Sequence, residues 1–261
     1  PERAFFMFIP TLNTYLIVCP LVFLAGFVDS VAGGGGLISI PAYLFAGLPI
    51  HMAYGTNKLS SCSGTSVAVW QYSRSGYIHW RTAAFACGGA LCGSFLGAKL
   101  AMFLSETYLH YCLLAILPVV AVFLIFNRNF GKTPHPRSFS PAAASLLSVA
   151  IGLVLGCYDG FFGPGTGTFL VIAFTALLGQ ELTEATGNTK LVNLCSNVSA
   201  LCAYLLGGKV LWAVGIPAAL CNIAGNWLGA HLAVRKGASF IRPLVLLSVG
   251  MLFINLVGDL M

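Results

Sequence analysis

The chain carries one pattern of residues twice. The first copy contains the string G-F-V-D-S-V-A-G-G-G-G, which begins at residue 26, and the second contains G-C-Y-D-G-F-F-G-P-G-T-G, which begins at residue 156. Asp29 and Asp159 are 130 positions apart; after a two-residue insertion the offset becomes 132, which aligns Lys58 with Lys190. Two halves that interrupt apolar runs at corresponding positions are typical of transporters, in which the interruptions mark the binding site.

The composition places this repeat in a lipid environment. Hydrophobic residues make up 58% of the chain and charged residues only 8%, whereas soluble domains have about 25% charged residues. We therefore expect an all-α polytopic membrane protein with about 8–10 transmembrane segments, each full crossing needing about 20 apolar residues. The expected segments are 12–31, 37–47, 57–72, 82–104, 110–126, 142–158, 167–179, 189–206, 211–233 and 241–258.

Two of these segments, 37–47 and 167–179, are too short for a full crossing and follow glycine-rich interruptions. They are predicted to be half-helices of broken or re-entrant hairpins, which a membrane tolerates only where protein or a water-filled cavity covers the backbone. Each half then crosses an odd number of times, so we predict two inverted-topology repeats. Their bounds are 1–126 for the N-terminal repeat, 127–141 for a linker and 142–261 for the C-terminal repeat.

The basic residues set the expected orientation. One side of the membrane collects most of them, and cytoplasmic loops are enriched in Lys and Arg. We therefore expect a multi-pass protein of a bacterial-type plasma (inner) membrane with a cytoplasmic linker and both termini outside. No nucleic-acid partner is expected from the net charge of +6. The residues on the basic side are Arg74, Arg81, Arg128, Lys132, Arg137, Arg235, Lys236 and Arg242.

The glycine interruptions are the first candidate for substrate binding. Each precedes a short helix, whose unpaired amide groups and positive dipole end favour an anion. Glycine also lets a ligand approach the backbone closely. The candidate residues are Gly33, Gly34, Gly35 and Gly36 in the first copy, and Gly163, Gly165, Thr166 and Gly167 in the second.

Two lysines supply the second candidate. The strings Y-G-T-N-K and T-G-N-T-K are expected to open helices, and they place Lys58 and Lys190 ahead of apolar sequence. An intramembrane cation indicates function by default, although a lysine in a first helical turn can also extend to a membrane surface. Polar side chains around these lysines would bind the oxygens of a small solute, namely Asn57, Ser61, Asn188 and Asn193.

Asp29 and Asp159 precede the two glycine interruptions. They could carry protons, bind a coupling cation, or cap the amide groups of the loops. No metal site and no cofactor are expected, because the cysteines lie in apolar runs without C-x-x-C spacing and suit helix packing. No H-E-x-x-H, G-x-S-x-G or P-loop pattern is present, so an enzyme is not expected.

Taken together, the strings V-D-S-V-A-G-G-G-G, Y-G-T-N-K-L, G-C-Y-D-G-F-F-G-P-G-T-G and T-G-N-T-K-L-V-N resemble the TauE/SafE, or sulfite exporter, family of membrane transporters. The resemblance covers the chain from about residue 16 to residue 257, with both copies of the repeat. It implies a secondary transporter for sulfur-containing anions such as sulfite, sulfoacetate and other organosulfonates. It also implies that the glycine interruptions and the two lysine motifs form a central site.

The residues themselves leave alternatives open. The lead hypothesis is alternating-access transport of a small sulfur-containing oxyanion, with a proton or another ion as a coupling partner. A passive anion channel, or a permease for another small anion or a cation, would use similar sites.

Overall fold

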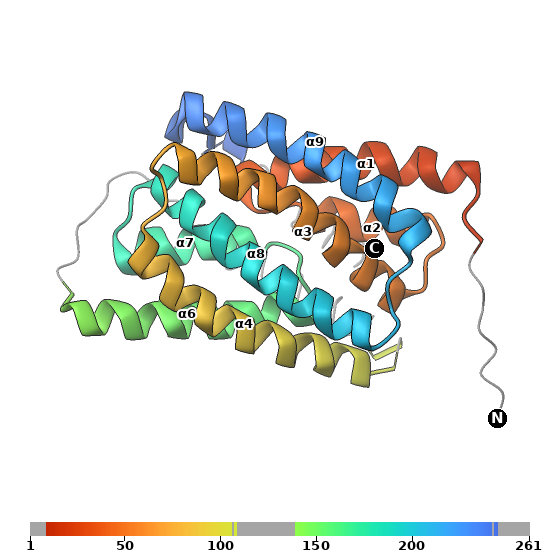
Figure 1. The fold of residues 1–261 in the computed structure, drawn as a ribbon, viewed down its shortest axis with the longest axis horizontal. Helices are drawn as coiled ribbons and strands as arrows, with labels where there is room; N and C mark the ends of the chain where they lie inside the picture. Colours follow the sequence, from red (N-terminus) through yellow and green to blue (C-terminus); the bar gives the residue numbers. More distant parts are fainter. Residues whose placement is uncertain (1–8, 106, 109–138, 242, 245–261) are drawn as a thin grey trace, which may run out of the picture.

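The computed structural model describes residues 9–105, 107–108, 139–241 and 243–244, and every regular element within them is a helix (Figure 1). The first half contributes α1 (Leu12–Ala32), α2 (Gly36–Phe45), α3 (Ile50–Arg74) and α4 (Trp80–Phe103). The second half contributes α6 (Pro141–Phe161), α7 (Thr166–Leu178), α8 (Leu182–Leu206) and α9 (Trp212–Lys236). The expected segment 110–126, nearly all of 241–258 and most of the linker lie outside the described residues.

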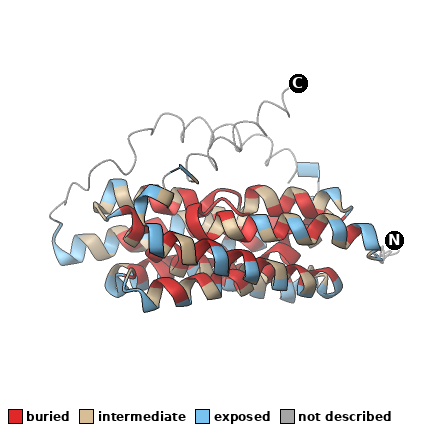
Figure 2. Cartoon of the chain, turned by 90° about the horizontal axis from the view of Figure 1, so that it is seen from above, coloured by how far each residue is buried: buried red, intermediate tan, exposed pale blue. Residues whose placement is uncertain are grey.

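The lengths of the helices agree with an all-helical membrane protein. Among the described helices, α1, α4, α6 and α9 are long and apolar enough to cross a membrane, whereas α2 and α7 are short apolar helices. Both short helices were expected. Large hydrophobic side chains such as Leu16, Leu146 and Leu220 are exposed on the outer faces of the bundle. Buried residues follow the inner faces of the helices (Figure 2), so the apolar outer surface suits contact with lipid.

The predicted starts of two helices were wrong. Helix α3 begins at Ile50 and α8 at Leu182, so Lys58 and Lys190 lie well inside helices and not in their first turns. The glycines before them do not interrupt the helix; they allow close packing. A Cβ atom at Gly55 would lie 2.1 Å from the carbonyl oxygen of Lys209, and one at Gly187 would lie 2.2 Å from that of Tyr77.

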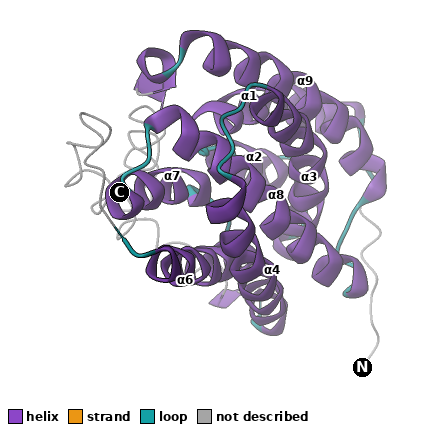
Figure 3. Cartoon of the chain, turned by 60° about the vertical axis from the view of Figure 1, so that its left-hand side comes forward, coloured by secondary structure: helices purple, strands orange, loops and turns teal. Residues whose placement is uncertain are grey.

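The same two contacts show the direction of α3 and α8. Gly55 near the start of α3 touches the loop after α8, and Gly187 near the start of α8 touches the loop after α3. These helices, which the repeat makes equivalent, therefore run antiparallel. They lie between the pair α1 and α9 and the pair α4 and α6 (Figure 3).

Stripes of small residues form packing surfaces between the helices. Helix α4 places Gly89, Gly93 and Gly97 against backbone atoms of α6, and α9 places Gly225 and Gly229 against backbone atoms of α1. At each of these glycines an added Cβ atom would come within 2.5 Å of an atom of the partner helix. Each half therefore packs its last described long helix against the first helix of the other half, so the halves are interlocked.

Candidate functional site

The two glycine interruptions meet in the interior. Helix α1 ends before Gly33, whose φ is 76°, and α7 begins after Gly165, whose φ is 78°; both values favour glycine. A Cβ atom at Gly33 would lie 2.3 Å from the carbonyl carbon of Gly167. The hydroxyl of Thr168 donates a hydrogen bond to the carbonyl oxygen of Ala32 at 2.8 Å. The two interruptions thus pack backbone against backbone, which side chains larger than glycine would prevent.

One buried ion pair lies beside this contact. The Nζ atom of Lys58 in α3 donates hydrogen bonds to Asp159 Oδ2 at 2.7 Å and to Asn197 Oδ1 at 2.9 Å. Asp159 also accepts a hydrogen bond of 2.5 Å from the hydroxyl of Ser196. Lys58 is only 1% exposed, which rules out its extension to a membrane surface in this conformation.

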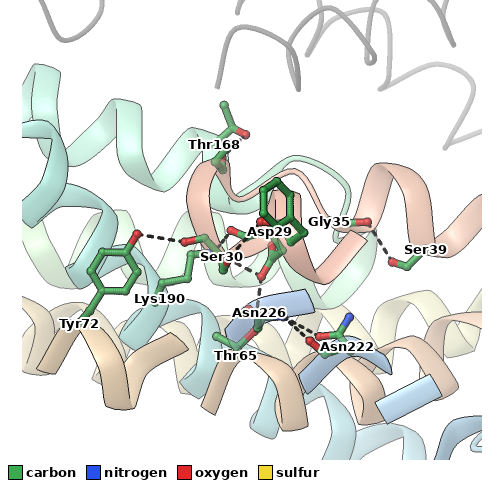
Figure 4. A network of polar contacts seen from close by, with 12 residues as sticks. Asp29, Ser30, Gly35, Ser39, Thr65, Tyr72, Thr168, Lys190, Asn222 and Asn226 are labelled. Atoms are coloured by element: carbon green, nitrogen blue, oxygen red, sulfur yellow. Dashed lines mark hydrogen bonds and ion pairs between the residues drawn. The ribbon is translucent and has the colours of Figure 1, made fainter. Parts of the chain in front are cut away.

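A second ion pair has the equivalent residues. Lys190 in α8 donates from Nζ to Asp29 Oδ2 at 3.2 Å and to the carbonyl oxygen of the same residue (Figure 4). The hydroxyl of Thr65 also contacts Asp29 Oδ2 at 3.5 Å. Lys190 is fully buried. Each lysine therefore pairs with the aspartate of the other half, in a reciprocal pattern that crosses between the repeats.

The aspartates pair with lysines and do not cap the loops. In the described part of the chain, neither Asp29 nor Asp159 accepts a side-chain hydrogen bond from an amide group of the glycine interruptions. Such a buried pair is costly to break by removing one partner, because the other charge is left without compensation. The pairs make the site neutral overall, with two positive and two negative side chains.

A polar cavity is lined by Lys58 and Asp159 of the first pair and by Asp29 of the second. Its volume is about 20 Å³. That is room for about one water molecule. The cavity is therefore too small for a polyatomic anion until side chains or helices move. Its lining residues are Asp29, Gly33, Gly36, Asn57, Lys58, Ser61, Asp159, Gly163, Asn193 and Asn197.

Several expected site residues stand apart from the cavity lining. Gly34, Gly35, Gly165, Thr166 and Gly167 belong to the interruptions but do not line the cavity, and Lys190 contacts Asp29 without lining the cavity.

Asn188 has a different position again. Its Oδ1 accepts a hydrogen bond from the amide group of His79, and its Nδ2 donates to Gln180 Oε1. The equivalent Thr56 accepts from the amide group of Leu211. These two side chains hold loops in place.

Asn197 and Ser196 were not among the site residues predicted from the sequence. The helical spacing offered a signal, because Asn193, Ser196 and Asn197 share one face of α8. The structure also leaves buried polar atoms without a partner among the described residues, including Asn57 Oδ1 and its repeat equivalent, Thr189 Oγ1. Unpaired buried polar atoms are uncommon and identify places where a ligand or water can bind.

Comparison with known proteins supports a role in membrane transport. The family model described as sulfite exporter TauE/SafE matches residues 18–256. A probable membrane transporter protein of Sinorhizobium is 37% identical, over 91% of this chain and 90% of the relative.

Two further relatives agree. A probable membrane transporter protein of Haemophilus influenzae is 35% identical, over 91% of this chain and 92% of the relative. The probable membrane transporter protein YfcA of Escherichia coli is 32% identical, over 95% of this chain and 94% of the relative. No solved structure matches the chain. The chain is thus a multi-pass membrane protein that belongs to the TauE/SafE family of membrane transporters.

Proposed function

We propose that the chain carries a small sulfur-containing oxyanion, either sulfite or an organosulfonate such as sulfoacetate, across the membrane by alternating access. The substrate would bind in the cavity beside the two glycine interruptions. It is a transporter, not an enzyme, in this proposal. The description of the family as sulfite exporters supports the class of substrate, and the polar lining of the cavity supports the position of the binding site.

The observation that carries the proposal is the Lys58–Asp159 pair on the cavity wall. An entering oxyanion would compete with the carboxylate of Asp159 for the Nζ atom of Lys58, because both present oxygen atoms with negative charge. The amide groups of Asn193 and Asn197 and the hydroxyl of Ser61 line the same cavity and can donate to the remaining oxygens. Lys190 would act through Asp29, since it does not line the cavity.

Charge balance points to proton coupling. The empty site is neutral, so a monovalent anion would leave it with one uncompensated negative charge, which is expensive away from water. Protonation of Asp159 as it leaves Lys58 would restore neutrality. We therefore propose that one proton moves with each negative charge of the substrate and in the same direction.

The relation between the two halves suggests how the site could open to each side of the membrane in turn. We propose that residues 1–126 and 142–261 are inverted repeats related by a twofold axis in the membrane plane. The antiparallel arrangement of α3 and α8 and the reciprocal ion pairs support this relation. The small cavity would then belong to one state of the transport cycle, and the contact between the interruptions would open toward one side at a time.

We further propose that the linker 127–141 is cytoplasmic and both termini are outside, in a bacterial-type inner membrane. The supporting observation is the distribution of basic residues. Arg74 and Arg81 flank the loop between α3 and α4, and Arg235 and Lys236 end α9 at the same end of the bundle.

Transport by purified protein in lipid vesicles tests the function. Uptake of radiolabelled sulfite and of sulfoacetate should saturate with concentration, and taurine, isethionate, sulfate and acetate define the specificity. Linear, non-saturating flux would identify a passive anion channel instead. Preference for acetate or sulfate would indicate a permease for another anion, and transport of cations alone would overturn the assignment. A cation permease is disfavoured because both site carboxylates are already paired with lysines.

A further inference from the structure

A second cavity lies at the end of the bundle where α3 and α9 terminate. It has a volume of about 390 Å³. Its walls include Trp70 and Arg74 from α3 and Trp227, His231 and Arg235 from α9. Because it contains none of the residues that line the substrate cavity, it is a separate site. We call it the arginine–tryptophan cleft.

The walls of the cleft are held in place by direct contacts. The guanidinium carbon of Arg74 lies 5.0 Å from the centre of the Trp70 ring, and the rings of Trp227 and His231 stack with their centres 5.7 Å apart. The side-chain amide of Gln71 donates a hydrogen bond of 2.9 Å to the carbonyl oxygen of Trp227, which ties α3 to α9. The cleft is therefore organised without a ligand.

The cleft carries positive charge that no described carboxylate compensates. Among the described residues, no carboxylate forms an ion pair with Arg74 or Arg235, and no acidic side chain lines the cleft. Both arginines lie in the last turn of their helices and are exposed. A guanidinium group binds phosphate oxygens through two parallel hydrogen bonds, so two of them around one cavity favour a phosphate group.

The internal repeat supplies a comparison for this cleft. At the offset of 132, Arg74 corresponds to Leu206 and Arg235 to Phe103. Trp70 corresponds to Cys202 in the same alignment. At each of these positions the equivalent helix of the other copy forms with an apolar residue or a cysteine, so the fold does not need the arginines. The charged cleft is a feature of one end of the molecule only.

The tryptophans indicate that the phosphate group belongs to a lipid and not to a free phosphate. Trp70 is 53% exposed and Trp227 52% exposed, and both belong to helices that pack against each other in the apolar bundle. Tryptophan is enriched where a protein meets the headgroup region of a bilayer. A free phosphate would contact only the arginines, whereas a phospholipid would also cover the exposed indole rings with its glycerol and acyl groups.

We propose that the arginine–tryptophan cleft binds the headgroup of an anionic phospholipid. The phosphate lies between Arg74 and Arg235, and the start of the acyl chains covers Trp70 and Trp227. Basic pockets at the ends of transmembrane helices suit anionic headgroups, because local lipid charge adds to direct contacts. The bound lipid would fix the position of this end of α3 and α9 relative to the membrane surface.

Tryptophan fluorescence gives a direct test, because the chain has only four tryptophans. Replacing Trp80 and Trp212 by Phe leaves Trp70 and Trp227 as the reporters. This variant is placed in vesicles of phosphatidylcholine that contain either brominated phosphatidylglycerol or brominated phosphatidylcholine at the same mole fraction. We expect clearly stronger quenching by the brominated phosphatidylglycerol, which shows selective binding of the anionic lipid next to these two rings.

Substitution of the arginines identifies the contacts. Arg74→Leu with Arg235→Phe, which gives each position the residue of its counterpart in the other repeat, should reduce the preference for phosphatidylglycerol on the order of tenfold or more. Arg74→Gln with Arg235→Gln should have the same effect, which guards against an effect of altered packing. Lys99→Met, an exposed cation outside the cleft, should retain the preference.

Two results would overturn the proposal. Equal quenching by the two brominated lipids would show that the cleft does not select an anionic headgroup. Loss of the preference on adding soluble glycerol phosphate at millimolar concentration would show that the cleft takes a free phosphate compound and not a lipid.

Discussion

Lys58 in α3 is joined to Asp159 in α6 by a 2.7 Å hydrogen bond between residues 101 positions apart in the chain. Its repeat counterpart, Lys190, is joined to Asp29 over 161 positions. The two pairs are alike in chemistry but differ in surroundings, since Lys58 lines the cavity and Asp159 has the additional donor Ser196. The proposed site is thus built by both halves while its two sides remain chemically distinct.

Replacing the lysines tests the electrostatic role of the site. Lys58→Met should weaken sulfite or sulfoacetate binding by about a hundredfold, because it removes the cation that an oxyanion would contact and leaves Asp159 uncompensated. Lys190→Met should have a smaller effect on affinity, because Lys190 acts through Asp29. Lys58→Arg should recover only part of the affinity, since a planar guanidinium does not replace a compact ammonium. Isothermal titration calorimetry on the purified variants measures all three affinities.

Lys99→Met is the matched control, because Lys99 is an exposed cation in α4 outside the site. Its affinity should equal that of the unmodified protein. Unchanged affinity in both Lys58→Met and Lys190→Met, with both proteins folded, would contradict a role for these lysines in binding an anion.

The aspartates test the coupling to protons. An inward proton gradient should drive uptake of the anion into vesicles, with proton uptake reported by a pH-sensitive dye inside them. Asp159→Asn should abolish the response to the gradient but allow exchange of labelled for unlabelled anion, because an amide cannot take up a proton. Ser61→Ala is the control, since it changes a residue of the same cavity without changing its charge. Gradient-driven uptake by Asp159→Asn would exclude this carboxylate as the proton carrier.

Much of this arrangement could be predicted from the sequence. The repeat located the glycine interruptions and the lysines, because glycine patterns and charged residues within apolar runs can be recognised in a short stretch of sequence. The partners of the lysines could not be predicted, since a pair such as Lys58 and Asp159 depends on how distant helices cross. The starts of α3 and α8 were misplaced because Gly55 and Gly187 look like helix-breaking residues. Their actual role, close contact with distant backbone, is visible only in three dimensions.

The contact between the two glycine interruptions predicts which glycines cannot be replaced by larger residues. Gly33→Ala should abolish transport, because its Cβ atom would lie 2.3 Å from the backbone of Gly167 and the residue has a positive φ. Gly35→Val should also abolish transport, because a Cβ atom there lies 2.6 Å from that of Asp29 and would displace this carboxylate from Lys190. Uptake of labelled sulfite in vesicles gives the rates, and thermal unfolding of the purified proteins separates lost transport from lost folding.

Gly88→Ala provides the control, because no atom lies within 4 Å of the added Cβ and the residue is exposed on α4. It should transport normally and gain up to about 1 kcal/mol of stability from the better helix propensity of alanine. Wild-type rates in Gly33→Ala and Gly35→Val would show that the contact between the interruptions is not needed for transport.

The ends of the bundle predict the orientation in the membrane. Ser75 lies in the exposed loop after α3, next to Arg74, while Lys209 lies in the equivalent loop after α8. Because α3 and α8 run antiparallel, these loops are at opposite ends, and from the distribution of basic residues we predict that Ser75 is in the cytoplasm. In a variant without native cysteines, Lys209→Cys should react with a membrane-impermeant maleimide added to intact cells. Ser75→Cys should react only after the cells are permeabilised. The reverse pattern would invert the proposed orientation, and labelling of both in intact cells would contradict the placement of these loops on opposite sides of the membrane.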